Sequence, residues 1–310
     1  MNILLVGWFS WENSDSTAGD FLVCDVVRHW LESAGHTCDV ALAAPFRGGV
    51  DLKRVDPHHY SHVVFVCGPF MQNHWEAEFL GRFADCCVIG VNLTLLISLD
   101  VWNPFDFLVE RDSSRAAHPD LAFIAPQQPV PVVGVCLVEP YDGAMVDLAN
   151  AAIERLVATR QMAVVAIDTR LDINTTSLRT KAEIESILAR MDVVITTRLH
   201  GTVLALKNGV PVLAIDAERG GAKIKRQAET IGWPVVFTVD ALDDHALEHA
   251  LTYCLSADAR AKARECAARA VSMAADIERT FVAALEGLRP QDSKRAERLA
   301  FAVNKGWKRV

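Results

Sequence analysis

The sequence predicts an α/β protein with two doubly wound domains, each built on a parallel sheet covered by helices on both faces. Short continuous apolar runs alternate with helix-length segments, which is typical of parallel strands buried on both sides. The chain has 310 residues, of which 51% are hydrophobic, and this length suits two domains of ordinary size. A proline-dense segment, 126–131, divides the chain and predicts a linker.

The first half predicts five strands and an amphipathic helix. The helix begins near Gly19-Asp20 and ends at about Ser33, with its apolar residues on one stripe. The expected strands are Ile3–Val6, Cys38–Leu42, His62–Cys67, Val88–Leu93 and Phe105–Val109.

The second half repeats this alternation. Its expected strands are 132–138, 163–167, 193–196, 212–215 and 235–238, and its expected helices are about 143–158, 179–191, 202–208, 223–231 and 244–256. The Ala-rich segment from Asp258 to Leu288 predicts a long helix or a helical pair. We therefore expect a first domain over 1–127, a second domain over 130–288 and a basic tail or crossing helix over 289–310. Because parallel sheets bind ligands outside the carboxyl ends of their strands, the two domains are expected to face each other across a cleft.

The composition argues against a nucleic-acid-binding, secreted or membrane-spanning protein. The formal net charge of −8, with scattered Lys and Arg, argues against a nucleic-acid partner. The apolar opening residues 1–7 predict a first strand rather than a signal peptide, and no segment is long and apolar enough to suggest a membrane span. The eight cysteines lack the spacing of a metal site or a disulfide framework, which favours a reduced, cytoplasmic protein.

The loop after the predicted strand 193–196 concentrates groups that bind anions. Thr196, Thr197 and Arg198 precede His200, and we expect a helix to start at Gly201-Thr202. An arginine forks onto carboxylates and phosphates, and a helix amino end presents unpaired amides and a positive partial charge. A histidine beside them moves protons near neutral pH. The loop therefore predicts an active site for an anionic substrate.

The stretch Asp192–Asp216 resembles the signature of the polysaccharide pyruvyltransferase family. It has an apolar strand, Arg-Leu-His at 198–200, a short helix, Gly-Val-Pro at 209–211 and another apolar strand. The segment Lys223–Gly232 resembles the family's Lys-led helix that ends at a Gly. Weaker resemblances lie in Gly19-Asp20, in Val109–Ser114 and in Asp120–Phe123. The resemblance implies two facing Rossmann-like domains of the glycosyltransferase-B-like build.

The resemblance also implies a reaction, the transfer of pyruvate from phosphoenolpyruvate to a sugar diol as a ketal, with release of phosphate. His200 and Arg198 are the expected catalytic residues, with His200 as general acid or base. The expected donor-binding residues are Thr196, Thr197, Arg198, Gly201, Thr202, Lys223 and Arg170. Lys225 competes with Lys223 for the donor role, and Arg170 would replace an arginine of the family that is absent at Leu137-Val138-Glu139. No metal is expected, because the leaving group is a phosphate already held by cations and the sequence shows no His, Asp or Glu cluster at ligand spacing. No cofactor is expected beside phosphoenolpyruvate, which is a co-substrate.

The first domain is expected to hold the acceptor, a carbohydrate or a lipid-linked sugar. The predicted acceptor-side residues are Trp11, Asn13, Asp15, Asp20 and Arg111. Each has a structural alternative: a core-anchoring tryptophan, a helix cap at Asp20 and an ion pair at Arg111-Asp112.

Three alternatives stay open from the sequence. The first is a sugar-nucleotide-dependent glycosyltransferase of the same build, with Glu218 at the ribose, and the second is a non-catalytic relative. The third concerns the tail 289–310, which carries seven Lys and Arg against two acidic residues. Either it contacts an anionic membrane, which would make the protein peripheral to that membrane, or it forms a helix that packs back on the first domain.

Overall fold

The computed structural model describes residues 1–72 and 74–288. The chain divides into two compact units, Met1–Gln128 and Pro129–Val310, so the division falls inside the proline-dense segment. The tail 289–310, with its predicted membrane contact or crossing helix, lies outside the described residues. The expected cleft between the two domains stays a prediction.

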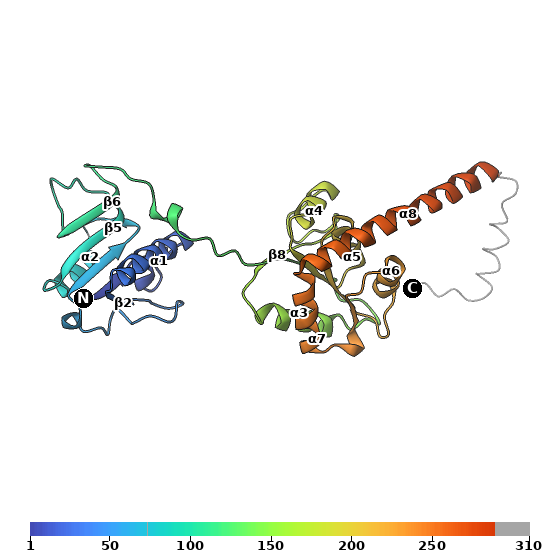
Figure 1. The fold of residues 1–310 in the computed structure, drawn as a ribbon, viewed down its shortest axis with the longest axis horizontal. Helices are drawn as coiled ribbons and strands as arrows, with labels where there is room; N and C mark the ends of the chain where they lie inside the picture. Colours follow the sequence, from blue (N-terminus) through green and yellow to red (C-terminus); the bar gives the residue numbers. More distant parts are fainter. Residues whose placement is uncertain (73, 289–310) are drawn as a thin grey trace. The chain divides into compact units, whose positions relative to one another are not determined.

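Unit 1 is built on a parallel sheet with strand order β2-β1-β3-β5-β4, and β6 pairs with β5. Figure 1 labels β2, β5 and β6 of this sheet. Its strands are β1 (Asn2–Val6), β2 (Thr37–Val40), β3 (His62–Val66), β4 (Pro69–Phe70), β5 (Cys87–Leu95) and β6 (Phe107–Asp112), and its helices are α1 (Ala18–Ser33) and α2 (His74–Arg82). Short 3-10 turns lie at Trp8–Ser10, Pro57–His59 and Leu121–Ile124.

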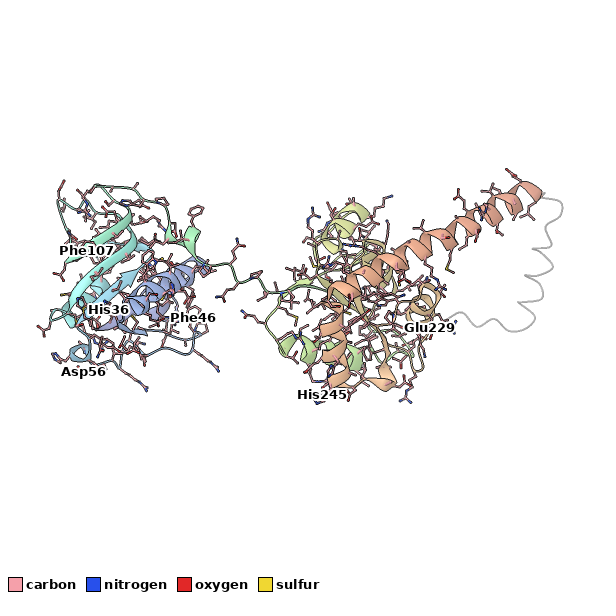
Figure 2. The ribbon with its side chains drawn as sticks, viewed as in Figure 1. His36, Phe46, Asp56, Phe107, Glu229 and His245 are labelled. Carbon is pink, nitrogen blue, oxygen red and sulfur yellow. The ribbon has the colours of Figure 1, made fainter. Side chains whose placement is uncertain are left out.

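The sheet of unit 1 is buried on both faces. Along β1, Leu4 and Val6 join one apolar cluster while Ile3 and Leu5 join another. Successive side chains of a strand point to opposite faces, so each cluster covers one side of the sheet. Phe46, labelled in Figure 2, packs its ring against Phe21 of α1 at 4.7 Å between centroids. The continuous apolar runs in the sequence follow from this two-sided burial.

Unit 2 is built on a parallel sheet with strand order β11-β10-β9-β7-β8. Its strands are β7 (Val132–Cys136), β8 (Ala163–Ala166), β9 (Val193–Thr196), β10 (Val212–Asp216) and β11 (Val236–Thr238). Its helices are α3 (Val146–Ala158), α4 (Lys181–Leu188), α5 (Leu199–Lys207), α6 (Lys223–Ile231), α7 (Asp244–Cys254) and α8 (Ala257–Gly287). A further 3-10 turn lies at Val239–Ala241.

The long helix α8 confirms the expectation for the Ala-rich segment. Its first turns pack Ala259, Ala263 and Cys266 into the core of unit 2. From residue 271 onward every described position of the helix is exposed, and Figure 1 shows this half leaving the body of its unit.

The predicted fold class, an α/β chain with two parallel sheets, is confirmed, but several boundaries are wrong. Helix α5 begins at Leu199 rather than at residue 202, because the first helical hydrogen bond runs from the Thr202 amide to the Arg198 carbonyl. Helix α2 and the two-residue strand β4 were not expected. Strand β6 lies two to three residues later than predicted.

No helix among residues 1–72 and 74–288 is both long enough and apolar enough to cross a membrane.

Candidate active site

The strand order of unit 2 places its switch point between β7 and β9. From the first strand of the unit, β7, the chain crosses to β8 on one side and then returns to β9 on the other. In open parallel sheets the loops at such a reversal diverge and leave a crevice at the carboxyl ends of the strands. The loop after β7 holds Glu139, and the loop after β9 holds Thr197 and Arg198.

A pocket of about 140 Å³ lies at this edge, within unit 2. It is lined by Val138, Tyr141, Thr169, Thr197, Arg198, Leu199, His200, Asp216, Ala217, Lys223 and Ile224. Three of the predicted cationic or proton-transferring residues therefore share one pocket: Arg198, His200 and Lys223.

Arg198 is held by acceptors from three places. Its Nε donates to the Leu137 carbonyl at 2.7 Å, and its Nη2 lies 2.5 Å from Glu139 Oε2 and 3.5 Å from Asp168 Oδ1. The side chain is only 13% exposed. The guanidinium is thus fixed in place, and two carboxylates already neutralise its charge.

The two carboxylates on Arg198 differ in how they are held. Asp168, after β8, accepts the amides of Arg170 at 2.9 Å and Thr175 at 3.1 Å, and its side chain is 6% exposed. Burial acts to raise its pKa, but these hydrogen bonds and the Arg198 charge together leave the pKa below its usual value. The side chain of Glu139 is 48% exposed, and its carboxylate pairs with Arg198 and Arg170. The pKa of Glu139 is also lowered, by a hydrogen bond from its own backbone amide and by Arg198 and Arg170, against the effect of burial.

Arg170, the expected substitute for the missing arginine, lies at the same edge. It forks onto Asp172, with Nε at 3.0 Å and Nη2 at 2.5 Å, and its Nη1 lies 3.6 Å from Glu139 Oε1. Arg170 therefore comes close to Arg198 through a shared carboxylate, although it does not line the pocket.

The three threonines use their hydroxyls inside the protein. Thr196 Oγ1 donates to the Cys136 carbonyl at 2.6 Å and accepts the Arg198 amide at 2.9 Å. Thr197 Oγ1 accepts the Val138 amide at 2.8 Å, and Thr202 Oγ1 donates to the Arg198 carbonyl at 3.1 Å. All three are buried. The hydroxyls of Thr196 and Thr197 were predicted to bind donor oxygens. This does not fit Thr196, whose hydroxyl proton is used on the Cys136 carbonyl, whereas Thr197 lines the pocket and its donor contact stays a prediction.

Gly201 has a role in packing. A Cβ at this position would lie 2.4 Å from Thr196 Oγ1 and 3.1 Å from Cys136 Sγ. The first turn of α5 therefore approaches the sheet more closely than any side chain at residue 201 would permit.

His200 lies in the first turn of α5, with its side chain exposed at the pocket. It makes no hydrogen bond or ion pair with any residue in the described part of the chain. Because α5 begins at Leu199, the amides of Leu199, His200 and Gly201 come before the first helical hydrogen bond. The sequence predicts unpaired amides at Gly201 and Thr202. The structure does not confirm this for the Thr202 amide, because that amide already donates to the Arg198 carbonyl.

The structure separates the two candidate lysines. Lys223 lines the pocket, and its ammonium lies 5.6 Å from the centre of the Tyr141 ring. Lys225 donates its ammonium to the Gly220 carbonyl at 3.1 Å. Tyr141 in turn donates its hydroxyl to Glu218 Oε1 at 3.2 Å, so the proposed ribose-binding carboxylate already has a partner.

Asp216 occupies the amino end of α6. Its Oδ2 accepts the amides of Ala222 at 2.8 Å, Ile224 at 3.1 Å and Lys225 at 3.1 Å. This buried carboxylate fills the anion position of that helix. Helix α5 therefore supplies the amino end at the pocket whose first amides have no partner among residues 1–72 and 74–288.

The predicted acceptor residues of unit 1 do not gather around one pocket. Trp11 packs its ring against Phe65, Trp75 and Phe79 at 5.0–5.9 Å between centroids and also lines a 260 Å³ pocket. Asn13 and Asp15 are exposed, and Asn13 has a positive φ of 57°.

Asp20 and Arg111 are engaged within unit 1. Asp20 Oδ2 accepts the Thr17 amide at 2.7 Å and the Thr17 hydroxyl at 2.9 Å, so it caps α1. Arg111 lies 2.8 Å from Asp120 and 3.2 Å from Asp112, and it also contacts the Thr94 hydroxyl. These geometries match the structural alternatives, the helix cap and the ion pair.

Sequence reasoning missed five members of this edge: Glu139, Tyr141, Asp168, Asp172 and Asp216. Asp168 and Asp216 carried a usable signal, because each directly follows a predicted parallel strand. Among residues 1–72 and 74–288 there is no group of three His, Cys, Asp or Glu side chains arranged to hold a metal ion. All eight cysteines are free thiols.

No curated protein matches the chain. Among solved structures the chain is similar to the spinosyn rhamnosyltransferase SpnG, with 13% identity over 91% of this chain and 100% of that one and a TM-score of 0.33. It is also similar to an α,α-trehalose-phosphate synthase (UDP-forming) from Burkholderia vietnamiensis, with 12% identity, 92% and 71% coverage and a TM-score of 0.36. The glycosyltransferase SnogD from Streptomyces nogalater gives 14% identity, 91% and 99% coverage and a TM-score of 0.32. Residues 165–219, which carry both Arg198 and His200, match the polysaccharide pyruvyl transferase family, and the resemblance drawn from the sequence is confirmed over that stretch.

Proposed function

We propose that the chain transfers pyruvate from phosphoenolpyruvate to two hydroxyls of a sugar and releases phosphate. One observation carries this proposal. Arg198 and His200, both within the family-matched residues 165–219, line the same 140 Å³ pocket as Lys223. A guanidinium, an ammonium and an imidazole thus meet at the carboxyl edge of a parallel sheet, where such folds bind ligands.

The charge and size of the pocket suit a small anionic donor. Phosphoenolpyruvate carries a carboxylate and a phosphate, which Arg198, Lys223 and the amides of the first turn of α5 are suited to bind. Pockets for drug-sized ligands measure about 300–1,000 Å³. The 140 Å³ pocket is smaller, which favours phosphoenolpyruvate over a sugar nucleotide.

The proposed chemistry needs one proton delivered and two hydroxyl protons removed. A proton adds to the methylene carbon of the enol while the first acceptor hydroxyl adds to C2 and loses its proton. The second hydroxyl then attacks C2 and loses its proton as the C2–O bond to phosphate breaks. Of the two hydroxyl protons, one restores the proton that the general acid gave to the methylene carbon, and the other leaves on the phosphate. The products are the cyclic ketal and inorganic phosphate. His200 is placed to donate the first proton, because its side chain is exposed at the pocket and pairs with no described residue.

For the acceptor we propose only a chemical class: a carbohydrate with two neighbouring hydroxyls, free or lipid-linked. Trp11, Asn13 and Asp15 remain candidates for contact with it, since aromatic faces and exposed polar groups suit sugars. Asp20 and Arg111 are not assigned to it, because the helix cap and the ion pairs already use their charged groups.

The test is phosphate release from phosphoenolpyruvate, measured with the full chain against a panel of sugar diols. We expect release with at least one acceptor, and a loss of ~10²–10⁴-fold in His200→Ala. The matched control is His245→Ala, an exposed histidine on α7 that is labelled in Figure 2 and does not line the pocket. Release that falls equally in both variants, or no release with any acceptor, would contradict the proposal.

A further inference from the structure

Glu139 lies between two arginines, and each of its carboxylate oxygens faces a different one. Oε2 lies 2.5 Å from Arg198 Nη2, and Oε1 lies 3.6 Å from Arg170 Nη1. Two guanidiniums that share one carboxylate in this way form a binding site for an oxyanion. The site is filled by a side chain of the protein itself.

The surroundings distinguish Glu139 from the other carboxylates at this edge. Asp168 is fixed by two backbone amides and is 6% exposed, so it cannot leave Arg198 without leaving those amides unpaired. Glu139 sits in the loop between β7 and α3 and is 48% exposed. Besides its own backbone amide, the described residues that its carboxylate pairs with are Arg198 and Arg170, so no other backbone amide holds it. Of the acids on Arg198, Glu139 is therefore the one free to move away.

We propose that Glu139 occupies the anion-binding position between Arg170 and Arg198, and that an anionic group of the donor binds there by displacing it. Asp168 then keeps Arg198 in place as a positioning residue, through its contact with Nη2. This inference rests on the proposed function for the identity of the donor, but not for the existence of the anion site.

Displacement has a consequence for specificity. A side chain tethered beside its partner competes at an effective concentration in the millimolar range. A free monocarboxylate carries the same charged group as Glu139. Below that effective concentration it therefore does not displace the Glu139 side chain. A phosphate brings more charge and more acceptor oxygens to the same two guanidiniums, so the exchange favours it. Glu139 thus selects phosphate-bearing donors over simple carboxylic acids.

The experiment is calorimetric titration of the full chain with inorganic phosphate and, separately, with acetate, at constant pH and ionic strength. Glu139→Gln keeps the size of the side chain and removes the competing charge. Asp172→Asn is the matched control, because it removes one charge of the same sign that contacts Arg170 but lies outside the shared position. We expect Glu139→Gln to lower the Kd for phosphate about tenfold and Asp172→Asn to lower it at most about threefold. Acetate should bind Glu139→Gln measurably and bind the wild-type chain much more weakly.

Three results overturn the inference: an unchanged or higher Kd for phosphate in Glu139→Gln, equal effects of the two variants, or no phosphate binding by any of the three proteins. Circular dichroism of each variant shows that it is folded, and Glu139→Ala provides a second variant without the competing carboxylate. If phosphate binds Glu139→Gln more tightly while phosphoenolpyruvate is not turned over with any acceptor, the anion site stands and the proposed function fails.

Discussion

The two units place equivalent loops at equivalent points of their sheets, but they use the charged residues of these loops differently. In each unit the switch point lies beside the first strand, β1 in unit 1 and β7 in unit 2. In unit 2, Arg198, His200 and Lys223 line a pocket at that edge. In unit 1, Asp20 caps α1, and Arg111 pairs with Asp112 and Asp120.

The difference shows what a motif in the sequence does and does not establish. A charged residue at or after the end of a parallel strand lies at the carboxyl edge of the sheet in both units. Arg198 and Arg111 each pair with two carboxylates, but Arg198 also lines a pocket and shares Glu139 with Arg170. The comparison therefore predicts that changes in unit 2 affect turnover and that matched changes in unit 1 affect stability.

The largest expected effect is the difference in phosphate release between a variant of Arg198 and a variant of Arg111. We expect Arg198→Gln to lower phosphate release from phosphoenolpyruvate about 10²–10³-fold, because it removes the cation fixed beside the reacting anion. Arg111→Gln should lower the melting temperature while phosphate release per folded molecule stays within about twofold of wild type. Steady-state release and thermal denaturation of both variants check this. A turnover loss of similar size in Arg111→Gln would contradict the claim that the two units use their arginines differently.

The next effect is the pH dependence of stability in unit 1. The hydrogen bond from Arg115 holds the pKa of Glu110 at about 2, although the side chain is buried. A lowered pKa stabilises the folded state above about pH 4.5, and this contribution is lost as the pH falls toward 2. It amounts to at most about 3 kcal/mol, and the solvent around Arg115 reduces it.

Urea unfolding of wild type and Glu110→Gln between pH 6 and pH 2.5 measures this contribution. The free energy of unfolding of wild type should fall more steeply below pH 4.5 than that of the variant. Parallel curves would show that the pair between Glu110 and Arg115 adds no pH-dependent stability.

A smaller effect separates the two lysines of α6. Lys223 lines the pocket whereas Lys225 donates to the Gly220 carbonyl. We expect Lys223→Gln to raise the KM for phosphoenolpyruvate about tenfold, as for the loss of one charge-assisted contact of about 1.4 kcal/mol. Lys225→Gln should change it by less than about twofold. The reverse order would assign the donor contact to Lys225.

The smallest effect concerns the cap of α1. Asp20→Ala removes the carboxylate that accepts the Thr17 amide and hydroxyl, and should cost about 0.5–2 kcal/mol of unfolding free energy. Phosphate release should stay near the wild-type value. A strong loss of release with unchanged stability would make Asp20 an acceptor base instead.

Much of the fold could be predicted because it depends on local patterns. The buried runs of β1, β3, β7, β9 and β10 are continuous in the sequence, and parallel strands buried on both faces require such runs. The Arg198-Leu199-His200 loop could be placed at the ligand-binding edge for the same reason. The predicted start of α5 was wrong because Arg198 is the residue that caps its amino end. The Arg198 carbonyl accepts the first helical hydrogen bond, and an arginine is not a residue type that marks a helix start.

The rest depends on contacts between residues far apart in the sequence. Glu139 follows β7 and Arg198 follows β9, and they meet because these strands are neighbours in the sheet. No spacing in the sequence marks this contact, because the two residues belong to different strand–loop units.

The most direct measurement is a crystal structure of the chain with phosphoenolpyruvate bound. The account predicts density for the donor in the unit 2 pocket between Arg198 and Lys223, with Glu139 turned away from both arginines. Donor density elsewhere, or donor bound while Glu139 still bridges Arg170 and Arg198, would contradict it.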